Sequence, residues 1–180
     1  MKKAASIFLR SDVTKHDIER LSRWMEQREV TRYLNESAQI SRALLELSTE
    51  VPEPLLGQRL AADGRFYFVS LSCLRPIGFI SLRRMRTCGD WEIVAAIGET
   101  ALWGAGYGAR ALRLALQEAF VPRDTHIQRL YATIHRENTR SMRLFLHAGF
   151  VSVGEAGACM RLSMTRDAYF HAKNCVNSGT

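Results

Sequence analysis

A short segment near the middle of the chain limits the possible folds more than any other. Residues 91–97 read W-E-I-V-A-A-I, an apolar run of strand length. Glycines follow at 104, 106 and 108, and residues 112–120 then place apolar side chains at helical spacing. The segment predicts a buried strand, a glycine-rich turn and an amphipathic helix, as in α/β domains.

The predicted turn has the features of a phosphate-binding site. The first N–H groups of a helix lack partners within it, the helix dipole favours anions there, and glycines let the backbone approach them. The nucleoside-triphosphate loop does not fit, because Gly108 is followed by Ala109-Arg110 rather than Lys-Ser/Thr. The dinucleotide fingerprint G-x-G-x-x-G fits poorly, since the spacing here is G-x-G-x-G. From the glycines alone, a purely structural turn remains open.

A second motif follows the helix. Residues 129–134 read as a short strand and residues 138–148 as a helix that stops at Gly149-Phe150. Taken with W-G-A-G-Y-G at 103–108, this motif resembles the acyl-coenzyme-binding motifs of the GNAT acetyltransferase superfamily. The W-G-x-G-Y pattern resembles the branch of ribosomal-protein alanine N-acetyltransferases, although Trp103 stands where the superfamily usually has Arg or Gln.

Other local patterns agree with that order of elements. A first strand is expected over residues 6–10, and Thr14 with Asp17 predicts a capping box at the next helix. A short helix is expected within residues 41–48, with Pro52 and Pro54 ending it. Residues 65–71 and 77–84 read as a hairpin.

The resemblance covers residues 65–165 well and the N-terminal third loosely. It implies an α/β, single-domain GNAT fold: a mixed central sheet of about six to seven strands flanked by about four helices. We expect this domain to occupy residues 1–170 and residues 171–180 to form a flexible tail.

The resemblance also implies acetyl-CoA as the co-substrate. We expect the backbone of the glycine turn to bind the pyrophosphate, with Arg110 adding charge, and the pantetheine to run along the end of the preceding strand. Gly98 in that strand indicates a β-bulge, and a free N–H near Ile97 would stabilise the oxyanion. The expected donor-binding residues are Ala96, Ile97, Gly98, Gly104, Ala105, Gly106, Tyr107, Gly108, Ala109, Arg110, Asn138, Ser141 and Phe145.

The implied reaction is acetyl transfer to a primary amine by direct attack. An alkyl ammonium has a pKa of about 10.4, so a base must remove a proton at neutral pH. Glu92 and Glu99 are the candidate bases, on opposite faces of the strand unless the bulge changes the alternation. Phe145 stands where many members have a tyrosine that protonates the leaving thiolate.

The acceptor remains open. Tyr33, Asn35 and Glu36 are candidate acceptor contacts, and the amine could belong to a small molecule or to a protein N-terminus. A non-catalytic acyl-CoA-binding module is the first alternative, because Phe145 lacks a hydroxyl. A basic nucleic-acid-binding domain is a weaker alternative, because the basic residues are scattered.

Composition supports this interpretation. The chain has 180 residues, 47% of them hydrophobic, which suits one globular domain. The net charge of +7 would steer an anionic coenzyme. Four scattered cysteines without a C-x-x-C pair favour free thiols, no metal and a cytoplasmic location. The apolar runs are too short for a membrane span or a signal peptide, and we expect a monomer or homodimer.

Overall fold

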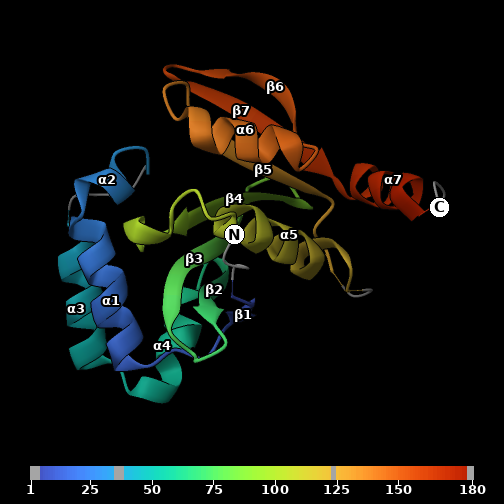
Figure 1. Cartoon of the computed structure of the whole chain (residues 1–180). Coiled ribbons are helices and arrows are strands. Elements are labelled where there is room, and N and C mark those ends of the chain that lie inside the picture. Colours follow the sequence, from blue (N-terminus) through green and yellow to red (C-terminus); the bar gives the residue numbers. More distant parts are fainter. Residues whose placement is uncertain (1–4, 35–38, 123–124, 178–180) are drawn as a thin grey trace. The chain divides into compact units, whose positions relative to one another are not determined.

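The computed structural model describes residues 5–34, 39–122 and 125–177 (Figure 1). A mixed sheet and its helices build this part of the chain. In order, the elements are β1 (Ile7–Arg10), α1 (Lys15–Glu26), α2 (Arg28–Thr31), α3 (Ile40–Glu50), α4 (Glu53–Leu60), β2 (Gly64–Leu71), β3 (Pro76–Arg84), β4 (Asp90–Ile97), the 3₁₀ turn η1 (Thr100–Leu102), α5 (Tyr107–Phe120), β5 (Arg129–His135), α6 (Thr139–His147), β6 (Val151–Ala156), β7 (Cys159–Thr165) and α7 (Arg166–Asn177).

The strands confirm the predicted α/β class. Seven strands are hydrogen-bonded in the order β1-β2-β3-β4-β5-β7-β6. β4 and β5 run parallel, whereas β5 with β7 and β6 with β7 run antiparallel, so the sheet is mixed. The described chain has more α-helices than expected, because the short helices α2 and α4 and the C-terminal helix α7, which runs to Asn177, are additional. Much of the segment expected to be a flexible tail is therefore helical.

Contacts along the chain separate it into two compact units. The first comprises Met1–Ser81 and Ala95–Leu114, and the second comprises Leu82–Val94 and Ala115–Thr180. In the first unit, the predicted capping box forms, with Thr14 and Asp17 each bonding the other's backbone N–H. α1 then buries Ile18, Leu21 and Trp24, and it packs beside α3 (Figure 1).

A buried ion pair ties α1 to β1. Arg10 donates from Nη1 to Asp17 Oδ2 at 2.9 Å and from Nη2 to Asp17 Oδ1 at 2.7 Å. Burial by itself would raise the pKa of Asp17, but the hydrogen bonds from Arg10 and Thr14 outweigh it and hold the pKa below its ordinary value. The pair therefore stabilises the fold only while Asp17 is ionised.

In the second unit, β5 alternates regularly between a buried and a more exposed face. Ala132 and Ile134 are buried, whereas Tyr131 and Thr133 are half-buried. α7 is fastened at its start, where Arg166 Nε donates to the Phe120 carbonyl at 3.1 Å. No helix in the described ranges is both long and apolar enough to span a bilayer.

Candidate functional site

The glycine turn in the first unit is open and has the backbone geometry that glycine permits. Gly104 and Gly106 have φ angles of +82° and +80°, in the left-handed region. Together with Ala105 they are exposed, and a Cβ built on either glycine would meet no atom within 4 Å. Glycine is therefore required here by the backbone angle, and the space beside the turn is free.

The turn leads directly into the N-terminus of α5. The first helical hydrogen bond runs from Arg110 N to Gly106 O at 3.2 Å, so the N–H groups of residues 107–109 have no acceptor within the helix. Ala109 is exposed and Gly108 half-buried. The Tyr107 ring is buried, and its hydroxyl accepts from Ala5 N at 3.2 Å. Such a helix start favours an anion.

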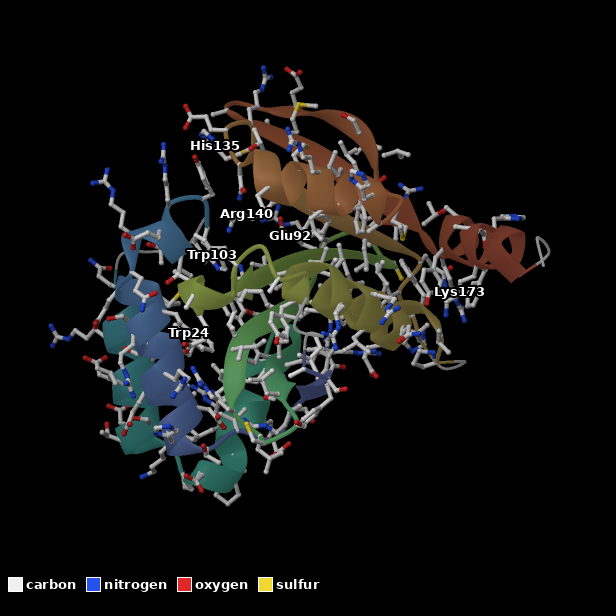
Figure 2. The ribbon with its side chains drawn as sticks, in the orientation of Figure 1. Trp24, Glu92, Trp103, His135, Arg140 and Lys173 are labelled. Carbon is white, nitrogen blue, oxygen red and sulfur yellow. The ribbon has the colours of Figure 1, made fainter. Side chains whose placement is uncertain are left out.

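Trp103 joins the turn to the end of β4. Its indole Nε1–H donates to the Ile97 carbonyl at 2.7 Å. Figure 2 shows Trp103 beside η1, at the start of the turn. Trp103, which departs from the superfamily motif, therefore has a structural role: it fixes the glycine turn to the strand before it.

The predicted β-bulge is present at the end of β4. Gly98 N and Glu99 N both donate to the Ile77 carbonyl, at 2.9 and 3.2 Å, so two residues of this strand end face one residue of β3. A Cβ on Gly98 would lie 2.1 Å from the Trp24 ring, and one on Gly78 would lie 2.2 Å from the Ala96 carbonyl. Both glycines are required by close packing around the bulge.

The Glu99 carboxylate is held by three donors from two separate segments. Its Oε1 accepts from Arg20 Nη1 at 2.9 Å and from Trp24 Nε1 at 3.2 Å. Its Oε2 accepts from Arg75 Nη2 at 3.2 Å. These bonds anchor α1 and the β2–β3 turn to the bulge, and a substrate amine would have to displace them to reach the carboxylate.

The Glu92 carboxylate, in the second unit, accepts a hydrogen bond from a neutral side chain. Glu92 lies on β4 (Figure 2). It pairs with Tyr131 on β5, and its Oε1 accepts from Thr133 Oγ1 at 3.0 Å. The donor is a neutral hydroxyl rather than an arginine. Of the two predicted bases, Glu92 is the one whose carboxylate carries no ion pair among the described residues.

The second motif builds the two ends of α6. Asn138 Oδ1 accepts from Ser141 N at 3.2 Å, so Asn138 is the N-cap of the helix. At the other end, Gly149 has φ of +98° and Phe150 N donates to Phe145 O at 3.1 Å, which forms a Schellman motif. The rings of Phe145 and Phe150 meet edge to face at 5.0 Å, and Phe145 is 4% exposed.

The structure thus groups the predicted site residues in two sets. Residues 96–99 and 103–110 lie in the first unit, whereas Glu92 and the α6 residues lie in the second. Tyr33 is half-buried, with the Arg32 guanidinium 5.0 Å from its ring centroid. Asn35 and Glu36 lie outside the described residues.

Sequence reasoning missed the partners of both glutamates. Thr133 could have been placed on the less buried face of β5 from the alternation of that strand, but its contact with Glu92 depends on the pairing of β4 with β5. Arg20 and Arg75 gave no local signal, because they are distant from Glu99 in the sequence. In the described residues, no three His, Cys, Asp or Glu side chains gather as metal ligands would.

Comparison with known proteins defines the class. The family model described as the acetyltransferase (GNAT) domain matches residues 7–151, and the chain therefore belongs to the GNAT acetyltransferase family. No curated protein sequence matches significantly.

Several solved structures share the fold. The aminoglycoside acetyltransferase AAC(6')-Ib in complex with coenzyme A and kanamycin has a TM-score of 0.73 and 20% identity, over 93% of this chain and 99% of that one. The spermidine N-acetyltransferase from Vibrio cholerae in complex with CoA and spermine has a TM-score of 0.73 and 18% identity, over 91% and 98%. A GNAT acetyltransferase from Bacillus anthracis has a TM-score of 0.71 and 17% identity, over 93% and 99%. At these identities the likeness concerns the fold.

Proposed function

We propose that the protein is an N-acetyltransferase that transfers the acetyl group of acetyl-CoA directly to a primary amine. The observation that carries the proposal is the open glycine turn at the α5 N-terminus, in a chain of the GNAT family. The structural neighbours in complex with kanamycin and spermine support a small-molecule amine as acceptor, and a protein N-terminus is the other acceptor class.

In this proposal the first unit holds the donor. The N–H groups of residues 107–109 bind the pyrophosphate beside the open turn at 104–106, and Arg110, whose guanidinium lies 5.6 Å from the Tyr107 ring centroid, adds positive charge. Since Trp103 occupies the Ile97 carbonyl and Ile77 occupies Gly98 N–H, the pantetheine would use the remaining backbone groups of Ala96 and Ile97. The Ile97 N–H would serve as the oxyanion donor.

The amine attacks the thioester carbonyl as its free base. The C–N bond forms, the C–S bond breaks, and the amine proton passes to Glu92. The proton passes directly or through water. Coenzyme A leaves as a thiolate and takes a proton from solvent, which its thiol pKa of about 8.5 allows.

The test is thiol release from acetyl-CoA with a panel of primary amines. We expect turnover with at least one amine, and we expect Glu92→Gln to lower kcat by about 10²- to 10⁴-fold, the usual contribution of a general base. Glu50→Gln is the matched control, since Glu50 is exposed on α3. Full activity of Glu92→Gln across the pH range would remove Glu92 as the base.

A second function is favoured by one specific observation. Phe145 has no proton to donate to the thiolate, and its buried ring packs on Phe150. A non-catalytic acyl-CoA-binding module would need no such donor. Tight acetyl-CoA binding without turnover on any amine would support that function over the enzymatic one.

A further inference from the structure

One face of the sheet in the second unit brings Glu92 together with a cationic side chain. Tyr131 and Thr133 lie on the face of β5 opposite the buried Ala132. Glu92 shares their face, because it pairs with Tyr131 and accepts the Thr133 hydrogen bond. Arg161 on β7 pairs with Thr133 and therefore projects from the same face.

The arginine is held by stacking rather than by an acid. The Arg161 guanidinium lies 4.0 Å from the Tyr131 ring centroid. A guanidinium stacked on an aromatic face keeps its N–H edge available for a carboxylate or phosphate. In the described parts of the chain, no ion pair joins Arg161 to a carboxylate.

Two other charged side chains on this face already have partners. Arg129 donates from Nη1 to the Tyr131 hydroxyl at 3.0 Å and lies directly opposite Asp90, so its charge is partly compensated. The Glu92 carboxylate accepts a hydrogen bond from Thr133, and in the proposed function it also receives the proton of the acceptor amine. A molecule whose amine reaches Glu92 must therefore pass beside a positive group on the next strands.

We propose that the acceptor carries an anionic group, a carboxylate or a phosphate, in addition to its primary amine. Arg161 binds that group while Glu92 receives the amine proton. This inference rests on the proposed function, because it takes Glu92 as the base. It separates the protein from neighbours in complex with spermine or kanamycin, whose polycationic ligands Arg161 would repel.

A matched set of acceptors tests the inference on the full chain. Butylamine, 1,4-diaminobutane, 4-aminobutanoate and 4-aminobutyl phosphate share one amine and chain length and differ only in the distal group; two- and three-carbon homologues vary the spacing. With thiol release as the readout, we expect kcat/KM for a carboxylate or phosphate acceptor to exceed that for the diamine at least tenfold. The preference should weaken with salt, since exposed charges are screened. The carboxylate and phosphate arms distinguish an amino-acid acceptor from a phosphorylated one.

Variants of Arg161 then test whether this side chain causes the preference for anionic acceptors. Arg161→Ala should lower the ratio of kcat/KM for the anionic acceptor over butylamine at least tenfold, and Arg161→Lys should retain part of it. Arg113→Ala, an exposed arginine on α5, is the control that leaves the ratio unchanged. Melting temperatures of all three variants show whether the fold is retained.

The outcomes separate this inference from the function on which it rests. Turnover that depends on Glu92 but is fastest with the diamine, or an unchanged ratio in Arg161→Ala, overturns the anionic acceptor and leaves the acetyltransferase standing. If the protein binds acetyl-CoA but no amine gives thiol release, the proposed function itself is overturned.

Discussion

At the scale of single residues, Glu92 and Glu99 differ in what holds their carboxylates. Glu99 accepts from two arginines and an indole N–H, as a residue that joins segments would. Glu92 accepts from one threonine hydroxyl. In the proposed mechanism, Thr133 fixes one carboxylate oxygen and so directs the other toward the proton that it must receive.

Substitution of Thr133 tests that role. Thr133→Val keeps the shape of the side chain and removes the donor, and a hydrogen bond to a charged group contributes about 1.5–3 kcal/mol. We expect kcat to fall about tenfold or more while the KM for acetyl-CoA is unchanged, with Thr133→Ser recovering most of the rate. Steady-state kinetics measures both, and a Thr133→Val enzyme with wild-type kcat would exclude the role.

At the scale of elements, the glycine turn and α5 act together. The backbone angles of Gly104 and Gly106 turn the chain so that the first N–H groups of the helix face open space. Trp103 holds the start of this turn on β4 through the Ile97 carbonyl. Binding of a diphosphate by this element depends on backbone geometry more than on any side chain.

A pair of matched substitutions tests this dependence. In Gly106→Ala an alanine must adopt a left-handed angle, which costs about 1–2 kcal/mol, and its methyl group would face the ligand. We expect at least a tenfold rise in the KM for acetyl-CoA. Gly157→Ala is the control, because Gly157 also has positive φ, +57°, and also borders open space, but it lies in the β6–β7 turn. Equal effects of the two substitutions would contradict a special role for the turn.

The link between α1 and β1 is an element-scale property with a defined pH dependence. Asp17 has a lowered pKa, so its stabilising effect is complete above its ordinary value of 3.8 and is lost as the pH falls through the lowered folded-state value. Removing one partner of a buried pair costs about 3–5 kcal/mol. We expect Asp17→Asn to lower the free energy of unfolding by about that amount at pH 7.

Urea unfolding of both proteins between pH 7 and pH 3 measures this effect. The difference between wild type and Asp17→Asn should be constant down to about pH 4 and should narrow below it. A difference that grows on acidification would show that the Arg10–Asp17 pair has another role.

At the scale of the whole molecule, local sequence patterns predicted the secondary structure, whereas contacts between residues distant in the sequence could not be predicted. The strand, bulge, turn and helix of residues 90–120 are as expected, because apolar periodicity and glycine act over a few residues. The Thr14 capping box followed from two side chains three residues apart at the start of α1. Pro54 was misread as a helix end, although it lies in the first turn of α4, where its missing N–H costs nothing.

The chemistry of the candidate site was harder to predict for a physical reason. The donors to Glu99 come from residues 20, 24 and 75, and the donor to Glu92 comes from residue 133. Such contacts are set by strand pairing and helix packing, which leave no pattern near either glutamate. The sequence therefore offered two bases, and only their surroundings in the structure favour Glu92.

The central claim is that the turn at residues 104–109 binds the diphosphate of acetyl-CoA, and calorimetry of the purified protein tests it most directly. Acetyl-CoA is compared with S-acetyl-4'-phosphopantetheine, which carries the same thioester arm without the pyrophosphate bridge and the nucleotide. We predict that acetyl-CoA binds at least a hundredfold more tightly, and that Gly106→Ala removes most of this difference. Equal affinity for the two ligands, or no heat with acetyl-CoA, would contradict the account.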